Sequence, residues 1–193
     1  MKRRKMLAIL FLLVVSTLGW FFFRLYKQAR HLSVDLSKLA TFNDCIAELA
    51  ETMIPETDAF PGAKSAGVGA TVLLLVEHCL EKSEQAIFLK GLADLDADCK
   101  RKFGRVFARC TESERLETLH RMEADAMFGG WFITKVRHRL FGKPFITLAK
   151  DLCVHAFCTS MQGAMNALAY DPVPGCYNGC LVLSEKQRSW ALV

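Results

Sequence analysis

The stretch "PFITLAKDLCVHAFCTSMQGAMNALAY", residues 144 to 170, is the longest helical pattern in the chain. Its apolar residues recur at steps of three and four, which places them on one face of a helix. Pro144 suits the start, because proline lacks the N–H that the first helical turn leaves unsatisfied. The pattern predicts one helix of about seven turns. Its predicted buried stripe consists of Phe145, Leu148, Leu152, Phe157, Met161, Met165 and Leu168.

Two shorter helical patterns lie nearer the amino terminus. The first runs from Thr41 to Ile54 and stops before Pro55, because the residue before a proline is disfavoured in a helix. A loop with Pro61 and Gly62 follows. The stretch "VLLLVEHCLEK", residues 72 to 82, then predicts a buried helix.

Two further helices are predicted before residue 144. One covers "SEQAIFLKGLADLDADCKRKF", residues 83 to 103, with Ser83 as its N-cap. The other begins at a capping box, in which Thr111 is followed three residues later by Glu114. We expect this helix to end at Gly129-Gly130.

No stretch alternates polar and apolar residues as a strand would, so the predicted fold class is all-α. We expect a bundle of roughly five or six helices behind an amino-terminal transmembrane or signal-anchor helix. The domain organisation is then an export or anchor segment, residues 1–30, and a single helical domain, residues 31–193. That domain ends in a tail rich in proline, glycine and cysteine.

The amino terminus has the pattern of a membrane segment. A basic head is followed by 18 uncharged residues, Met6 to Phe23, which span roughly 27 Å as a helix against a hydrocarbon core of ~30 Å. No small-x-small site follows the run, which favours a retained anchor over a cleaved signal peptide. Arg3 and Arg4 also fit a twin-arginine export signal. Both the anchor and the export signal remain open at this point.

The net charge of +5 misrepresents the folded part. Residues 1–30 contain seven Lys/Arg and no Asp/Glu, so the remainder carries −2. A nearly neutral domain lacks the basic surface that nucleic acid requires. We therefore expect a membrane, and no nucleic acid, among the partners of this chain.

The sequence motifs predict no catalytic, cofactor-binding or metal-binding residue. The histidines form no H-E-x-x-H pair, and neither a phosphate loop nor a nucleophile elbow is present. Among the eight cysteines, Cys45, Cys79 and Cys153 fit apolar helix positions, where a thiol acts as a small hydrophobe. Cys176 and Cys180 flank Tyr-Asn-Gly, a turn across which a local disulfide fits.

Two stretches give the chain a resemblance to a known family. They are "LAETMIPETDAFPGAKSAGV", residues 49 to 68, and "TSMQGAMNALAYDPVPG", residues 159 to 175. Together with the twin-arginine-like start, they resemble the gluconate 2-dehydrogenase subunit 3 family over residues 41 to 180. The amino-terminal apolar run is longer than a typical twin-arginine signal, so anchoring replaces cleavage in this interpretation.

The resemblance implies a non-catalytic small subunit of a membrane-bound, flavin-dependent sugar or sugar-acid dehydrogenase. In such complexes a flavoprotein of the glucose-methanol-choline oxidoreductase type carries FAD and oxidises the substrate, and a multi-haem cytochrome c accepts the electrons. The small subunit supports folding, export and stability of the flavoprotein. The implied location is the bacterial inner membrane, with the main domain facing the periplasm.

The tail "YDPVPGCYNGC", residues 170 to 180, is the predicted docking segment for that partner. Its prolines fix backbone angles, and a rigid segment loses little entropy on binding. The predicted docking residues are Tyr170, Asp171, Pro172, Pro174, Gly175 and Tyr177, with Tyr177 as an aromatic anchor. An alternative is that the tail closes over the subunit's own helices. Two other functions stay open: a free-standing membrane-anchored redox or metal-binding protein that uses its cysteines, and a structural envelope protein.

Overall fold

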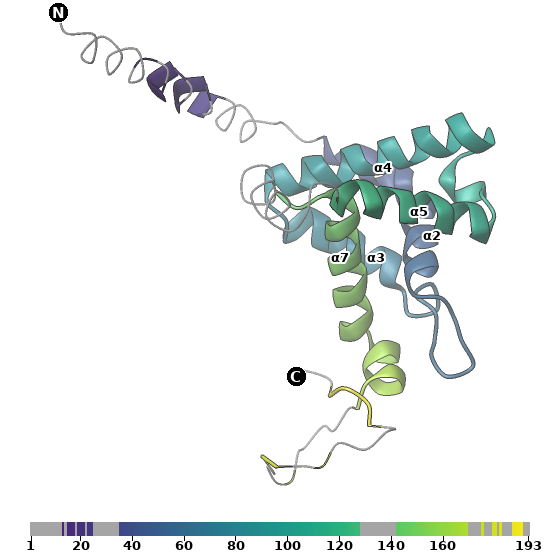
Figure 1. The fold of residues 1–193 in the computed structure, drawn as a ribbon. Helices are drawn as coiled ribbons and strands as arrows, with labels where there is room; N and C mark the ends of the chain where they lie inside the picture. Colours follow the sequence, from purple (N-terminus) through teal and green to yellow (C-terminus); the bar gives the residue numbers. More distant parts are fainter. Residues whose placement is uncertain are drawn as a thin grey trace, which may run out of the picture.

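The computed structural model describes residues 35–127 and 142–169, together with 13, 15–17, 19–21, 23–24, 175, 179–180, 182 and 187–190. These residues form an all-α bundle (Figure 1), as predicted, and the described part of the chain contains no strand beyond one isolated bridge between Ala169 and Trp190. The elements are η1 (Leu36–Phe42), α2 (Asn43–Met53), α3 (Val68–His78), α4 (Lys82–Phe103), η2 (Phe107–Arg109), α5 (Glu112–Met127), α7 (Phe145–Thr159) and η3 (Gly163–Ala167).

Helices α4 and α5 lie side by side, and α7 runs away from them towards the carboxyl-terminal end of the molecule (Figure 1). Helices α2, α3 and α7 also contact one another, so α2, α3, α4, α5 and α7 share the core. Its most completely buried large side chains include Ile46, Leu49, Val72, Phe88 and Leu92. Burial of such side chains supplies most of the favourable free energy of folding.

The start of α7 is fixed to α4 by an aromatic contact. The Phe88 and Phe145 rings lie 5.5 Å apart between centroids. Gly91 makes room for this pair, since a Cβ added there would lie 2.0 Å from Cγ of Phe145. The small residue therefore lets α7 approach α4 closely.

Local sequence signals account for several helix ends. Helix α2 ends at Met53, directly before Ile54 and Pro55, as predicted. The predicted capping box at the start of α5 is present: the Thr111 N–H donates to Oε2 of Glu114 at 2.8 Å. Thr111 Oγ1 accepts from the Glu114 N–H at 3.5 Å. Met127 is the last described residue of α5, so the predicted stop at Gly129-Gly130 lies outside the described residues.

The prediction of Ser83 as the N-cap of α4 is wrong. The N-cap is Glu81, whose side chain forms a reciprocal capping box with Glu84, so the cap lies two residues earlier than expected. Gln85, in the next turn, donates its amide to the carbonyls of Val76 and Glu77 at 2.9 and 3.1 Å. These bonds satisfy carbonyl groups that the end of α3 leaves free and hold α3 against α4.

The prediction of a single long helix after Pro144 is also wrong. Helix α7 ends at Thr159, because Ser160 adopts an extended conformation with ψ 150°, and the chain resumes as the short π-helix η3. Ser160 Oγ accepts from the Gly163 N–H at 3.0 Å, and this bond stabilises the break. The predicted stripe is buried as far as Phe157. Met161 and Met165, expected in the core, are 77% and 53% exposed, and Leu168 is partly buried.

Helix α3 buries one face rather than its whole surface. Val68, Val72 and Val76 are in the core, whereas Leu74 is 58% exposed. Cys79, at the end of this helix, is exposed and does not take the core position expected for it.

The predicted membrane segment falls largely outside the described residues, as do Arg3 and Arg4. Within the part of the chain that the structure describes, no helix is long and apolar enough to cross a membrane.

Candidate functional site

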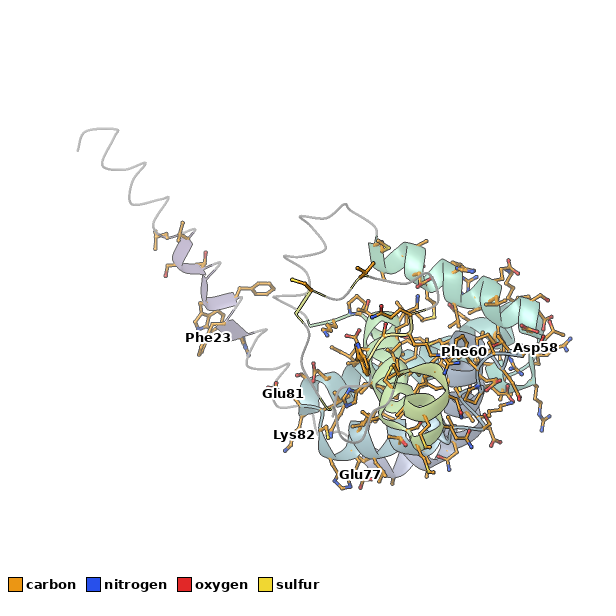
Figure 2. The ribbon with its side chains drawn as sticks, turned by 90° about the horizontal axis from the view of Figure 1, so that it is seen from below. Phe23, Asp58, Phe60, Glu77, Glu81 and Lys82 are labelled. Atoms are coloured by element: carbon orange, nitrogen blue, oxygen red, sulfur yellow. The ribbon has the colours of Figure 1, made fainter. Side chains whose placement is uncertain are left out.

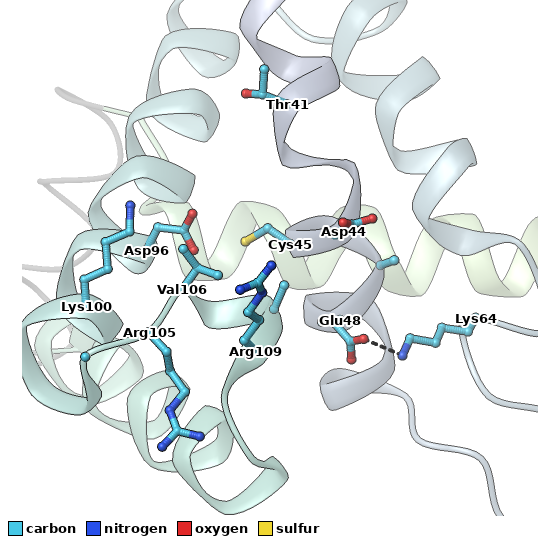
Figure 3. Close-up of a pocket in the computed structure, with 13 residues that line it drawn as sticks. Thr41, Asp44, Cys45, Glu48, Lys64, Asp96, Lys100, Arg105, Val106 and Arg109 are labelled. Carbon is cyan, nitrogen blue, oxygen red and sulfur yellow. Dashed lines mark hydrogen bonds and ion pairs between the residues drawn. The ribbon is translucent and has the colours of Figure 1, made fainter.

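A charged cleft of about 940 Å³ opens between α2, the carboxyl-terminal half of α4 and the segment that contains η2 (Figure 3). Its lining side chains come from parts of the sequence that lie far apart. Helix α2 supplies Asp44, Cys45 and Glu48, and α4 supplies Asp96 and Lys100. The remaining lining residues are Thr41, Ala47, Lys64, Gly104, Arg105, Val106, Ala108 and Arg109.

Glu48 is the most strongly held carboxylate of the cleft. It accepts from Nζ of Lys64 at 2.7 Å (Figure 3) and pairs with the Arg115 guanidinium. Partial burial alone would raise the pKa of Glu48, but the Lys64 hydrogen bond and the Arg115 charge hold this pKa below its ordinary value. Arg115 also donates to the carbonyl of Ala108 at 3.1 Å. This network ties α2 and α5 to the wall of the cleft.

Asp96 has a structural partner as well. Its Oδ1 accepts from the backbone N–H of Phe107 at 3.0 Å, which fixes η2 against α4. Burial, and then the neighbouring Asp96 carboxylate, raise the pKa of the Cys45 thiol above its ordinary value. Cys45 is therefore a neutral thiol and not an activated nucleophile.

Apart from Lys64, the cations that line the cleft have no such partners among the described residues. Within the described residues, Lys100, Arg105 and Arg109 take part in no ion pair. Since two of the three lining carboxylates are already engaged, these side chains are free to meet carboxylates of another molecule. No histidine is among the lining residues. The arrangement can bind an acidic group, and its lining offers no nucleophile with an adjacent base.

The loop between α2 and α3 borders the cleft through Lys64 and contains most of the first family-like stretch. Glu51 organises this loop: its Oε1 accepts from the Glu56 N–H at 3.2 Å and its Oε2 from the Lys64 N–H at 2.8 Å. Gly62 is needed there, because a Cβ would lie 2.5 Å from Oε1 of Glu51. Gly67, with φ 67°, then starts α3 in a conformation that favours glycine. These residues shape the loop rather than perform chemistry.

The carboxyl-terminal end of the chain returns to the bundle after the segment that was predicted to dock. The Ala169 N–H donates to the Ser189 carbonyl at 2.8 Å, and Arg188 donates to the Asn166 carbonyl at 2.7 Å. The Arg188 guanidinium also lies 6.0 Å from the ring centroid of Phe60 in the α2–α3 loop. Phe60 lies on the side of the bundle away from Glu81 and Lys82 (Figure 2). Residues 169 and 190 therefore meet, and they hold the two ends of the intervening segment together.

The predicted docking residues Tyr170, Asp171, Pro172, Pro174 and Tyr177 lie outside the described residues, and so does Cys176 of the predicted disulfide. Gly175 is exposed, and no atom would lie within 4 Å of a Cβ added there. Cys180 is also exposed. The docking segment and the disulfide therefore stay predictions.

No sequence motif predicts the charged cleft. The signal that pointed to it is the density of cations in "KRKFGRVFAR", residues 100 to 109, which supplies three of the four cationic lining residues. In the described part of the chain, no group of three or more His, Cys, Asp or Glu side chains is placed to hold a metal ion.

The fold and the cleft define the class of this protein as a small all-helical domain with a charged surface cleft. Residues 42–175 match the gluconate 2-dehydrogenase subunit 3 family, and the chain belongs to that family. The resemblance predicted from the α2–α3 loop and the late helix is thus confirmed over nearly the same range. Comparisons with curated proteins and with solved structures found no match.

Proposed function

We propose that this chain is the non-catalytic small subunit of a membrane-bound, periplasm-facing, flavin-dependent dehydrogenase of the gluconate or glucose type. In this role it supports folding, export and stability of the catalytic flavoprotein. The observation that carries the proposal is the family match over residues 42–175, which spans the whole helical bundle. Members of this family are accessory subunits of a dehydrogenase complex, which is consistent with a non-catalytic chain that acts by binding its partner subunit.

The proposal assigns the cofactors to partner subunits. FAD is held by a flavoprotein of the glucose-methanol-choline oxidoreductase type, and haem c by a multi-haem cytochrome. The cleft of this chain supports that assignment, because its lining contains two engaged carboxylates, a neutral thiol and three cations without an ion-pair partner among the described residues. Such a surface suits recognition of an acidic protein surface better than redox chemistry.

The proposed location is the bacterial inner membrane, with residues 31–193 on the periplasmic side. The uncharged run of Met6 to Phe23 behind a basic head supports an anchor. Arg3-Arg4 supports export through the twin-arginine route. On this proposal, the chain takes its flavoprotein partner across the membrane with it.

We place the flavoprotein contact at the carboxyl-terminal end, on Tyr170 to Cys180 and the apolar side chains beside it. Met161, Met165 and Trp190 are all more than half exposed at this end. Flexible methionine side chains adapt to partner surfaces, and an exposed tryptophan is a frequent interface anchor. The contacts of Ala169 and Arg188 with their own chain fix the residues on either side of 170–187, the stretch that contains the docking segment, so that less entropy is lost when it binds.

A pull-down from native membranes in mild detergent tests the proposed function. We expect a stoichiometric partner of flavoprotein size, identified by mass spectrometry, together with a flavin absorbance spectrum in the same fraction. A haem spectrum would add the cytochrome. A colourless chain without a flavoprotein would contradict the proposal.

A variant tests the docking segment separately. Replacing Pro172, Val173 and Pro174 by alanine removes its rigidity, and we expect less co-purified flavoprotein with an unchanged far-ultraviolet circular dichroism spectrum. The matched control is Leu74→Ala, which alters an exposed apolar residue on α3 instead. Unchanged co-purification of the triple variant would leave the alternative, in which the tail closes over its own helices.

A further inference from the structure

The carboxyl-terminal end of α4 and the segment after it form a cationic wall of the charged cleft. Lys100 lies in the last turn of α4, Arg105 directly after this helix, and Arg109 at the end of η2. All three residues are exposed, and none takes part in an ion pair among the described residues. Gly104, with φ 72°, ends α4 and turns the chain. Residues on both sides of this turn therefore line the same cleft.

The backbone of this wall is fixed before any ligand binds. Phe107, between the two arginines, is fully buried, and its N–H donates to Oδ1 of Asp96 at 3.0 Å. The Ala108 carbonyl accepts from Arg115 at 3.1 Å, and the Phe107 carbonyl accepts from the Cys110 N–H at 3.1 Å. A ligand would therefore order only the cationic side chains, which limits the entropy lost on binding.

Helix α2 lies on the other side of the cleft and carries carboxylates (Figure 3). Glu48 is held by Nζ of Lys64 at 2.7 Å. Asp44 is exposed and takes part in no ion pair among the described residues. Because like charges repel, Asp44 would oppose an acidic ligand, whereas the cations of the α4–η2 wall would attract it. We therefore expect the carboxylates of a ligand to lie against the α4–η2 wall.

The separation of the cations favours an extended segment over a small anion. Figure 3 shows the charged ends of Lys100, Arg105 and Arg109 apart from one another and not directed at one point. The cleft volume of about 940 Å³ is near the upper end of the ~300–1,000 Å³ range of small-molecule sites, so a single phosphate would fill little of it. In an extended chain, side chains two residues apart point the same way and lie about 7 Å apart. Acidic residues at alternate positions could therefore reach successive cations.

We propose that the cleft binds an extended acidic segment of a partner protein, whose carboxylates pair with Lys100, Arg105 and Arg109. Arginine presents paired N–H donors to a carboxylate, and lysine adds a point charge. Within the described part of the chain, the lining comes from residues 41 to 109 and none of it from α7 or beyond. The cleft is thus a second binding surface, and the inference does not rest on the flavoprotein contact proposed at the carboxyl-terminal end.

Fluorescence anisotropy tests the proposal on the full chain in a non-ionic detergent. The probe is a fluorescein-labelled octapeptide of alternating glutamate and glycine, and its matched control has glutamine in place of glutamate. We expect saturable binding of the glutamate peptide alone, and we expect salt to weaken it because exposed charge pairs are screened. Absence of binding, or equal binding of the two peptides, would overturn the proposal.

Variants that remove single charges locate the bound peptide. Arg105→Gln and Arg109→Gln should each weaken binding roughly two- to fivefold, with an unchanged circular dichroism spectrum because both residues are exposed. Lys90→Gln, which removes an exposed cation of α4 outside the cleft lining, should bind as wild type does. Asp44→Asn should bind roughly twofold more tightly, because it removes a repulsion. Equal weakening by Lys90→Gln, or weaker binding by Asp44→Asn, would place the peptide elsewhere and contradict the proposal.

Competition distinguishes an acidic segment from a small anion. Inorganic phosphate and sodium chloride are added to the peptide complex at matched ionic strength. We expect the two salts to displace the peptide equally, because each acts only by screening. Stronger displacement by phosphate would identify a site for a small anion and overturn the proposed acidic segment.

Discussion

The two family-like stretches of the chain follow a helix and contain proline and glycine, but they relate to the bundle in opposite ways. The α2–α3 loop is bound to its own helix by Glu51, and its Ala63 is fully buried. Beyond α7, the chain instead presents Met161 and Met165 to solvent. Proline and glycine content therefore does not distinguish an internal loop from a surface available to a partner. The burial or exposure of the neighbouring side chains does.

The difference has a physical origin. In the loop, one carboxylate satisfies two backbone N–H groups, and Gly62 leaves space for it. Beyond α7, Ser160 ends the helix, and Met161 and Met165 lie outside the core. An exposed apolar cluster costs free energy in the isolated chain. Its burial against a partner would recover that free energy, and this is the basis for assigning the docking role to the carboxyl-terminal end.

The largest effect on stability is expected at the start of α7, the helix that precedes the carboxyl-terminal region. Gly91→Ala places a Cβ 2.0 Å from Cγ of Phe145, and overpacking of this kind costs about 1–3 kcal/mol. We expect urea unfolding of the helical domain to shift by that amount. Gly175→Ala is the control, since a Cβ there meets no atom within 4 Å. Equal midpoints for the two variants would show that α7 is not fixed by this contact.

A smaller effect is expected in the loop. Glu51→Ala removes the acceptor for the N–H groups of Glu56 and Lys64, and the loss of two such bonds at a partly exposed site costs about 1–2 kcal/mol. Hydrogen exchange of these amides should rise together with the loss of stability. Glu56→Ala is the matched control, because the hydrogen bond of Glu56 uses its backbone. Slow exchange in Glu51→Ala would refute the role given to this carboxylate.

Local chemistry explains which features were predictable. The stop before Pro55 and the capping box of Thr111 depend on adjacent residues, and both predictions were confirmed. The break at Ser160 was missed because the apolar spacing continues through Met161 and Met165, although these residues leave the core. The cleft was missed because it exists only once α2, the loop and α4 are packed together. Its cations were visible in the sequence, but their grouping around one hollow was not.

Glu48 connects the α2–α3 loop to the cleft through Lys64, and its contribution to the stability of the fold depends on pH. Its pKa is lowered in the folded state, so its contribution to stability is present above the pKa of the unfolded chain, ~4.5, and is lost as the pH falls through the lower folded value. We expect Glu48→Gln to lose up to about 1 kcal/mol at pH 7. The gap to wild type should narrow as the pH falls below the unfolded-state pKa of ~4.5. Urea unfolding at several pH values measures this, and a gap that widens in acid would have the wrong sign.

The smallest effect on the isolated chain is expected at the exposed methionines. Met161→Asp and Met165→Asp remove no core packing, so their unfolding free energies should stay within about 0.5 kcal/mol of wild type. If this end binds the flavoprotein, each substitution places a charge in an apolar contact and should reduce co-purification strongly. Leu74→Asp, at an equally exposed apolar position on α3, controls for added charge. Loss of the partner in the methionine variants alone would separate a docking surface from ordinary surface exposure. If all three variants retain the flavoprotein equally, the docking role of the carboxyl-terminal end is contradicted.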